Sequence, residues 1–351
     1  MSYVVRKASL FIVMSMLLVL VSACGSSSKE TSTSETNAAA SETSASTETE
    51  KTDASAAEAN TLETRNIKHV LGELPITGVP NKIVVLEWTY AEDLLALGIQ
   101  PAGVADIENM KKNVALPIEL SADVQDVGTR QEPNLETIAA LEPDLIIGVK
   151  FRHEAAYDQL NAIAPTLIFD PYPAEGQGDQ YQEMVDTFKT IADAAGKSAE
   201  AEAVLADLQK SYDDAKSKLA AAGKDGRTFV LSMPWVDQNA VTFRLSTSNG
   251  LASKVLEQIG LKNGYQSAQF EAYGFTTSGV EALQSVQDAD YINITRETEV
   301  ADMLGKNAVW TGLTFVKENR LFALGGDAWP YGGPHSAKII VERAVQALTG
   351  Q

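Results

Sequence analysis

The sequence contains very little cysteine, with Cys24 as the one thiol among 351 residues. A single thiol excludes an internal disulfide, a cysteine-rich zinc site and an iron–sulfur cluster. Basic residues are also scarce, because 28 Lys and Arg stand against 47 Asp and Glu, for a net charge of −19. Nucleic acid requires a basic face, so we expect no nucleic-acid partner. The hydrophobic share of 44% is ordinary for a globular chain of about two domains.

The common catalytic and phosphate-binding motifs are missing as well. The chain has no P-loop, no Gly-rich dinucleotide turn after a strand, no G-x-S-x-G elbow and no H-E-x-x-H pair. Its three histidines, His69, His153 and His335, are too far apart to form a short-spaced metal set, and each is expected at the surface or in a hydrogen bond. The sequence therefore indicates a protein that is not an enzyme.

The first 24 residues have the features of an export signal. Arg6 and Lys7 precede an apolar run over residues 10–21, which is shorter than the roughly 20 residues of a membrane-spanning helix. The run ends in Val21-Ser22-Ala23-Cys24, which resembles a bacterial lipobox. The resemblance implies removal of residues 1–23 and lipidation of Cys24. The alternative is an ordinary secretory signal with a cysteine there by chance.

Residues 25–60 contain no aromatic residue and no Val, Ile, Leu, Met or Pro, and 24 of the 36 are Ser, Thr or Ala. Such a segment buries too little apolar surface to offset the entropy of ordering it. We therefore expect residues 24–60 to form a disordered tether behind the lipidated cysteine. Residues 61–351 then carry a net charge of −16.

The rest of the chain predicts two related α/β lobes with parallel-rich sheets, over residues 61–178 and 223–351. In the first, a strand over 82–86 is followed by a loop and a helix over 91–97 that ends at Gly98. In the second, a strand over 227–232 precedes a helix over 250–259 that ends at Gly260. A second sequence pattern also occurs in both lobes, a Glu followed by a predicted strand. It is Glu136 ahead of a strand at 145–147 in the first lobe and Glu281 ahead of a strand at 290–292 in the second. Alternating strands and helices indicate a parallel sheet.

Residues 179–222 link the two lobes. This segment is rich in Ala, Glu, Lys, Asp and Gln, and its apolar positions, among them Leu208 and Tyr212, recur at helical spacing. We expect a helical connector, divided at Gly196, that allows the lobes little movement.

Arginines and aromatic residues follow several of the predicted strands. In open α/β sheets the ligand crevice lies beyond the carboxyl ends of the strands, so these side chains are expected to meet there. Arginine binds carboxylates through paired hydrogen bonds, and aromatic rings supply apolar walls. Taken singly, each could equally be a surface charge or an edge aromatic. The candidate ligand-binding residues are Trp88, Arg130, Arg152, Trp235, Arg244, Tyr273, Trp329 and Tyr331.

A family resemblance rests on four segments. They are residues 69–86, the run Val127-Gly128-Thr129-Arg130, the run Leu141-Glu142-Pro143-Asp144, and the pair Arg152-His153. Over about residues 65–350 the chain resembles the iron–siderophore substrate-binding proteins of bacterial ABC importers, in the branch that includes the iron(III) dicitrate binder.

This resemblance implies Rossmann-like lobes joined by one long helix, with a ferric siderophore bound in a cleft between them. It implies that the chelator holds the iron, with no metal ligand from the protein and no cofactor. It also implies that Glu136 and Glu281 dock onto an ABC permease and, through it, its ATPase. The alternative for these two residues is an interaction with the helix dipole. The expected protein is a monomer, lipid-anchored on the extracellular face of a Gram-positive-type cell membrane.

Three arginines suit a citrate-based chelate, either ferric citrate or a citrate–hydroxamate siderophore. A catecholate siderophore, haem or cobalamin is the alternative ligand for the same class of receptor. Two further classes stay open: an extracellular two-lobed hydrolase, and a surface adhesin on a Ser/Thr-rich stalk.

Overall fold

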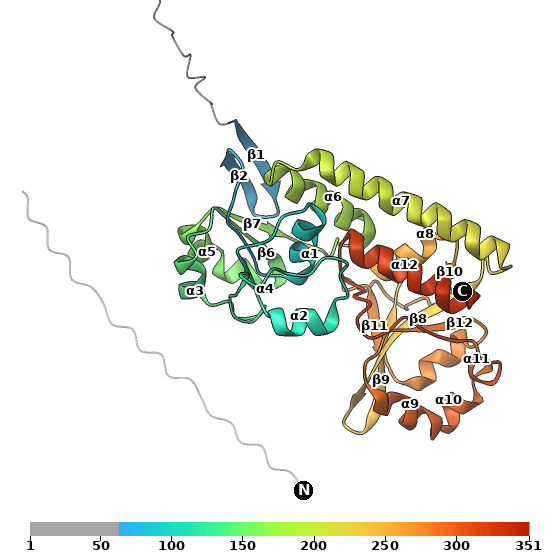
Figure 1. Cartoon of the computed structure of the whole chain (residues 1–351). Helices are drawn as coiled ribbons and strands as arrows, with labels where there is room; N and C mark the ends of the chain where they lie inside the picture. Colours follow the sequence, from blue (N-terminus) through green and yellow to red (C-terminus); the bar gives the residue numbers. More distant parts are fainter. Residues whose placement is uncertain (1–62, 351) are drawn as a thin grey trace, which may run out of the picture. The chain divides into compact units, whose positions relative to one another are not determined.

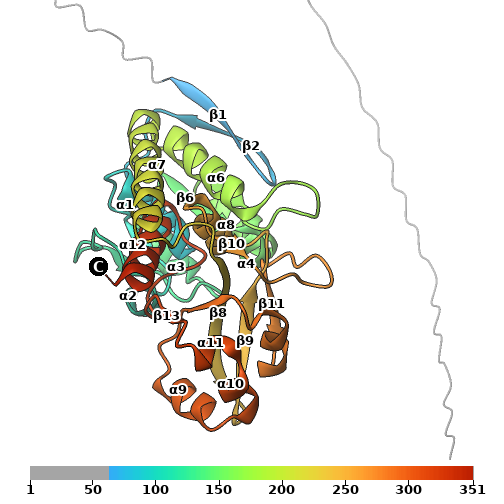
Figure 2. The same cartoon turned by 90° about the vertical axis from the view of Figure 1, so that its right-hand side faces the viewer.

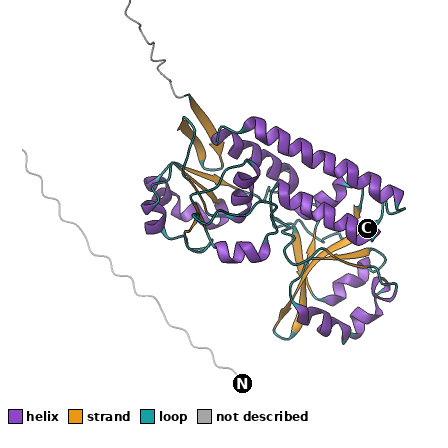
Figure 3. Ribbon diagram, in the orientation of Figure 1, coloured by secondary structure: helices purple, strands orange, loops and turns teal. Residues whose placement is uncertain are grey.

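The computed structural model describes residues 63–350. The expected signal (1–23), tether (24–60) and lipidation site Cys24 lie outside the described residues. Helices surround two separate groups of strands, which confirms the predicted α/β fold of two lobes (Figures 1 and 3). Within residues 63–350, none of the helices combines the length and the apolar character needed to cross a membrane.

The first lobe contains a five-stranded parallel sheet with the order β5-β4-β3-β6-β7. Its central strands are buried throughout and consist almost entirely of apolar residues, as expected for a parallel sheet covered on both faces. The strands are β3 (Ile83–Val85), β4 (Gly103–Val104), β5 (Gln125–Asp126), β6 (Leu145–Val149) and β7 (Thr166–Phe169). The helices are α1 (Trp88–Ala96), α2 (Ile107–Asn113), α3 (Leu135–Ala140), α4 (Lys150–His153), the 3-10 helix η1 (Glu154–Ala156) and α5 (Tyr157–Ile163). A hairpin of β1 (Thr64–His69) and β2 (Gly72–Thr77) extends from this lobe (Figure 2).

The second lobe contains a mixed sheet with the order β11-β9-β8-β12-β13, in which β10 also pairs with β8. The first residues of β8 (Thr228–Asp237) pair in parallel with β10 and β12, and its last residues pair antiparallel with β9 (Ala240–Ser246). The other strands are β10 (Lys262–Asn263), β11 (Phe275–Ser278), β12 (Asp290–Asn293) and β13 (Leu321–Ala323). The helices are α8 (Leu251–Gln258), the 3-10 helix η2 (Val280–Val286), α9 (Thr298–Gly305), α10 (Ala308–Gly312), α11 (Thr314–Lys317) and α12 (Pro334–Thr349).

The two lobes repeat one strand order. The parallel run β4-β3-β6-β7 in the first matches β10-β8-β12-β13 in the second. In both lobes the first helix, α1 or α8, ends before a glycine in the left-handed region, Gly98 at φ 75° and Gly260 at φ 88°. Glycine enters this region without the cost that a Cβ would add, so the chain can turn sharply into the next strand. The similarity between the lobes that the sequence predicts is therefore seen in the structure as a shared order of parallel strands.

Two expected element boundaries are wrong. Helix α1 begins at Trp88, because the Glu87 side chain accepts a hydrogen bond from the Trp88 backbone N–H and caps the helix. Strand β8 continues five residues beyond the expected end at 232 and forms a hairpin with β9. Trp235 and Arg244 consequently lie on strands and not in loops.

The connector consists of α6 (Gln180–Ala194) and α7 (Ser198–Ala221), which are separated at Gly196 (φ 66°). Phe188 on α6 belongs to the apolar core of the first lobe, whereas Tyr212 on α7 belongs to that of the second. Helix α12 lies beside α7 (Figure 1). The connector is therefore part of both cores and not a free linker.

Candidate ligand-binding cleft

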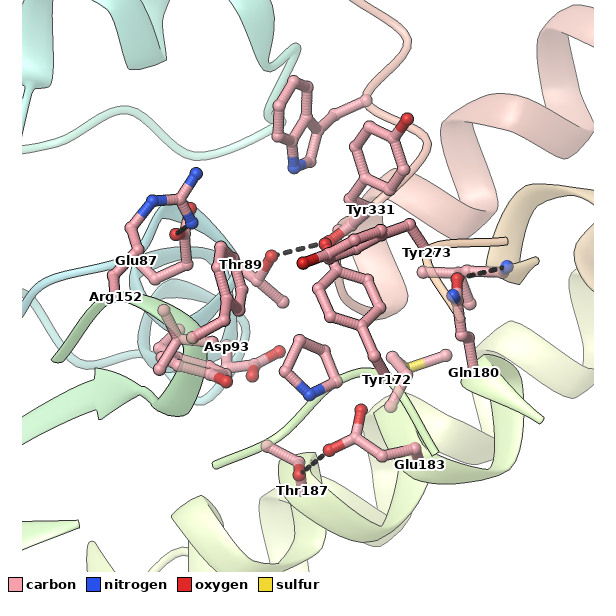
Figure 4. A pocket seen from close by; sticks show the side chains of 18 of the residues that line it. Glu87, Thr89, Asp93, Arg152, Tyr172, Gln180, Glu183, Thr187, Tyr273 and Tyr331 are labelled. Carbon is pink, nitrogen blue, oxygen red and sulfur yellow. Dashed lines mark hydrogen bonds and ion pairs between the residues drawn. The ribbon is translucent and has the colours of Figure 1, made fainter. Parts of the chain in front are cut away.

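A cavity of about 450 Å³ lies between the lobes. Side chains from α1, α4 and α6 line one part of it, and side chains from β9, β11 and the loop before α12 line another (Figure 4). Its volume is in the usual range for small-molecule sites, which is about 300–1,000 Å³. Six of the eight predicted ligand-binding residues line this cleft: Arg130, Arg152, Arg244, Tyr273, Trp329 and Tyr331.

Glu87 connects two of the arginines. Its Oε1 accepts a hydrogen bond from Arg130 Nη1 at 2.7 Å, and its Oε2 accepts one from Arg152 Nη1 at 2.5 Å. All three side chains are largely buried, with exposed fractions of 9% for Glu87, 13% for Arg130 and 19% for Arg152. One carboxylate thus compensates part of two positive charges and holds both guanidinium groups in place. Reasoning from the sequence missed Glu87, because a Glu before a helix reads as an ordinary surface residue.

Trp88 lies beneath Arg130 and does not line the cleft. The Arg130 Cζ is 3.4 Å from the centroid of the Trp88 ring, and Trp88 Nε1 donates to the carbonyl of Ala105 at 3.1 Å. With 2% of its surface exposed, Trp88 acts as a platform for the guanidinium and contributes a cation–π interaction. The ring of Trp329 packs against it at 5.1 Å and does face the cavity.

His153, which follows Arg152 in α4, connects this helix to the loop that carries Arg130. Its Nδ1 accepts from the Val149 backbone N–H at 2.9 Å, so the proton is on Nε2, which lies 2.8 Å from the carbonyl of Arg130 and donates to it. Burial lowers the pKa of His153, which keeps the ring neutral in this role. The expected hydrogen-bonding role of this histidine is confirmed.

Arg244 reaches the cleft from strand β9 of the second lobe. Its Cζ lies 4.7 Å from the centroid of the Phe275 ring and 5.4 Å from that of Trp235. Among the described residues it forms no ion pair, in contrast to Arg130 and Arg152. Trp235 contacts Arg244 but does not itself line the cavity.

A row of aromatic rings crosses the cleft. Tyr172, which follows β7, meets Tyr273 of the second lobe edge-on at 4.8 Å, and Phe151 packs on Tyr172 at 5.3 Å. Tyr273 continues the row to Phe275 at 6.3 Å. Phe151, Tyr172 and Phe275 were missed from the sequence, although Tyr172 follows a buried strand as the predicted residues do.

Two polar donors of the cleft are buried without a hydrogen-bond partner in the part of the chain that the structure describes. They are Arg130 Nε and Trp329 Nε1. Leaving such a donor unsatisfied costs about 1–3 kcal/mol. The charge at Arg130 Nε is compensated in part by Asp106, whose Oδ2 lies 4.0 Å away.

The far end of the cleft is acidic. Asp93 on α1 and Glu183 on α6 line it, together with Tyr90 and Thr187. Burial and the nearby carboxylates of Glu92 and Glu183 raise the pKa of Asp93 well above its usual range. Burial also raises the pKa of Glu183 to about 7, and Asp170 and Asp186 add to the increase. These carboxylates lie within helices, where the sequence pattern does not distinguish them from a solvated face.

The predicted docking residues lie away from the cleft. Glu136 is exposed in the first turn of α3, whose N-terminus is capped by Asn134. Glu281 is exposed in the first turn of η2. In the described residues 63–350, no group of three or more His, Cys, Asp or Glu is arranged to hold a metal ion.

Comparison with known proteins agrees with this architecture. The model of the periplasmic binding protein family matches residues 83–328. The Fe(3+)-citrate-binding protein of Bacillus subtilis is 30% identical over 275 residues, which cover 78% of this chain and 82% of that protein. The Fe(3+) dicitrate-binding periplasmic protein of Escherichia coli is 28% identical and covers 74% of this chain and 81% of its own length.

Solved structures show the same fold. The siderophore-binding protein of Vibrio cholerae, crystallised with Fe3+–Desferal, has a TM-score of 0.69 and 30% identity, and covers 76% of this chain and 97% of that one. These relatives are described as binding proteins and not as enzymes. The family model spans well over half of the chain, so this protein belongs to the periplasmic binding protein family.

Proposed function

We propose that this protein is the receptor of an ABC importer for iron, which binds a ferric siderophore in the cleft and delivers it to the permease. The observation that carries this proposal is a set of donor side chains that line the cavity: Arg130 and Trp329, whose Nε and Nε1 make no hydrogen bond among the described residues, and Arg244, which forms no ion pair there. A ferric chelate presents a shell of carboxylate, hydroxamate or carbonyl oxygens, which are the acceptors that such donors require.

We further propose a citrate-based ligand, either ferric citrate or a citrate–hydroxamate siderophore. The three arginines exceed the two carboxylates at their end of the cleft, since Glu87 pairs with Arg130 and Arg152, Asp106 Oδ2 lies 4.0 Å from Arg130 Nε, and Arg244 forms no ion pair among the described residues. An anionic ligand gains more from this excess than a neutral trihydroxamate does. The relatives that are described as citrate binders support the same choice.

Titration of tryptophan fluorescence tests this function. Ferric citrate is expected to quench the emission with an affinity in the micromolar range or tighter, because Trp329 lines the cavity and Trp88 lies directly beneath Arg130. Arg130→Ala and Arg244→Ala should each weaken binding by about tenfold, the loss of one charge-assisted hydrogen bond. Lys210→Ala removes an exposed cation on α7 and is the matched control.

A panel of chelates separates the alternatives. Ferric citrate, a ferric hydroxamate, a ferric catecholate, haem and cobalamin are compared in the same titration. Quenching by the catecholate, haem or cobalamin alone would replace the citrate-based ligand, and the absence of quenching by every compound would refute the receptor function.

The proposed receptor is anchored by a lipid on Cys24 and docks onto its permease through Glu136 and Glu281. In cells grown with labelled palmitate, the full-length chain should take up label and fractionate with membranes. Cys24→Ser should abolish both, and a labelled Cys24→Ser protein would contradict the anchor.

A further inference from the structure

The acidic end of the cleft contains polar groups that the proposed function does not use. Asp93 is 1% exposed and Tyr90 is 2% exposed, and both line the cavity. Asp93 Oδ1 and the Tyr90 hydroxyl have no hydrogen-bond partner among residues 63–350. Buried polar groups in native proteins nearly always have partners, so these two require an explanation.

The neighbouring carboxylate of Glu92, in contrast, has a structural role at the start of α12. Its Oε1 accepts from the Ser336 backbone N–H at 2.7 Å, and its Oε2 accepts from the Ser336 hydroxyl at 2.6 Å. Glu92 thus serves the N-terminus of α12, where a negative charge is favoured. Asp93 Oδ1 lies against Gly333, the N-cap residue of α12, but makes no hydrogen bond there, so its hydrogen-bonding capacity is not used by the helix.

Glu183 completes the acidic end. Its Oε1 accepts from the Thr187 hydroxyl at 2.5 Å, which leaves the second oxygen available. Figure 4 shows the carboxylates of Asp93 and Glu183 directed into the cleft, below the pair formed by Glu87 and Arg152. Glu183 also borders an outer groove that is lined by Asp170, Asp179 and Asp186. Two of these aspartates are paired with lysines, Asp170 with Lys150 at 3.2 Å and Asp179 with Lys254 at 3.8 Å.

The cleft is accordingly divided by charge. The end lined by Arg130 and Trp329 contains donors without a hydrogen-bond partner among the described residues. The end lined by Asp93 and Tyr90 contains oxygen atoms without one. Burial raises the pKa of both Asp93 and Glu183, and repulsion from the Glu183 carboxylate adds to the increase at Asp93. A cation placed between them would remove this repulsion and satisfy the acceptors.

We propose that Asp93, Glu183 and Tyr90 form a subsite for a protonated amine of the ligand. The preferred ligand is then a ferric chelate that carries an ammonium arm next to its oxygen-rich iron-binding groups. The subsite supplies three acceptors, one from each side chain, and a primary ammonium group has three N–H donors. This inference rests on the proposed receptor function and specifies its substrate class.

Two probes that differ only in the amine test the subsite. Ferric desferrioxamine B ends in a free primary amine, and its N-acetyl derivative has a neutral amide at the same position. By fluorescence titration at pH 7.5, the wild-type protein should bind the amine form about tenfold more tightly or better, as for a desolvated charge pair. Asp93→Asn and Glu183→Gln should each reduce this ratio, and the double variant should bring it close to one. Asp214→Asn, which alters an exposed carboxylate on α7, is the matched control and should keep the ratio.

The possible outcomes distinguish failure of the proposed amine subsite from failure of the proposed receptor function. Equal affinity of the wild-type protein for the two probes would overturn the subsite. So would failure to bind the amine form when ferric citrate binds, and in both cases the receptor function would stand. Failure of every ferric chelate to bind would overturn the receptor function itself. The wild-type comparison needs no variant, so the test holds even if a substitution impairs folding, which thermal unfolding would reveal.

Discussion

At the scale of single residues, Glu87 determines how the positive charge of the cleft is presented. It is buried, and each of its oxygens pairs with a different arginine. Without it, two guanidinium groups would lie close together in a poorly solvated site. Its role before ligand binding is therefore to stabilise the empty cleft, at the expense of part of the attraction for an anionic chelate.

Glu87→Gln should separate these two effects. Unfolding followed by fluorescence is expected to show a loss of about 2 kcal/mol of stability in the empty protein, because two largely buried arginines lose their counter-charge. Ferric citrate should raise the melting temperature of the variant by more than that of the wild type. Glu200→Gln, in the exposed pair with Lys197, should leave the stability nearly unchanged. Equal stability of Glu87→Gln and wild type would show that the ion pairs contribute nothing.

Glu183 makes stability depend on pH in the opposite sense to an ordinary salt-bridged carboxylate. Burial raises its pKa to about 7 in the folded protein, from 4.5 when unfolded, so the folded state holds the proton more tightly. Its contribution favours folding most below pH 4.5 and is lost as pH rises through 7. Between pH 5 and pH 8 this loss amounts to about 2 to 3 kcal/mol.

Glu183→Gln should therefore flatten the pH profile of the free energy of unfolding, measured with denaturant at pH 5 and pH 8. The variant gains relative to the wild type at pH 8, because its amide carries no charge to desolvate. Glu202→Gln, which alters an exposed carboxylate of α7, keeps the wild-type profile. Parallel profiles of Glu183→Gln and wild type would show that Glu183 is not desolvated.

At the scale of elements, the sequence predicted those parts of the fold that depend on local pattern. The apolar runs of β3 and β6 and the glycines after α1 and α8 are local signals, and each was interpreted correctly. The hairpin of β8 and β9 was not predicted. Its two-residue turn places Gln238 and Asn239 at φ 44° and 67°, and Gln gives little indication of a left-handed conformation.

In the candidate site, too, the sequence predicted only the residues that follow a local or topological rule. Arginines and aromatics beyond strand ends follow a topological rule, and six of eight such residues line the cleft. Glu87, Asp93 and Glu183 could not be recognised, because their meaning depends on residues that are distant in sequence. Glu87 pairs with arginines 43 and 65 positions away. Asp93 and Glu183 meet only because α1 and α6 pack against each other.

At the scale of the whole receptor, hydrogen bonds tie the first lobe to the segment around the start of α12. Thr89 Oγ1 donates to the carbonyl of Tyr331 at 2.6 Å, and the Ala115 N–H donates to the carbonyl of Asp327 at 2.9 Å. With the two hydrogen bonds between Glu92 and Ser336, these contacts join the lobes beside the cleft. We expect ligand binding to move the lobes little, so that the outer surface presented to a permease changes only slightly.

Docking through one acidic residue on each lobe suits such a stiff receptor, because the spacing of the two contacts is then set by the fold. Glu136→Ala combined with Glu281→Ala should abolish uptake of labelled iron chelate by cells while the purified variant binds the chelate as the wild type does. The reason is that both residues are exposed and lie outside the cleft.

Glu108→Ala combined with Glu299→Ala is a closely matched control. These residues are also exposed glutamates in the first turn of a helix, one in each lobe, so loss of a favourable helix-dipole interaction is common to both pairs. If docking is specific, only the pair Glu136 and Glu281 affects uptake. Equal loss of uptake in both double variants would attribute the effect to overall acidity, and a parallel loss of chelate affinity in Glu136→Ala/Glu281→Ala would remove the docking role.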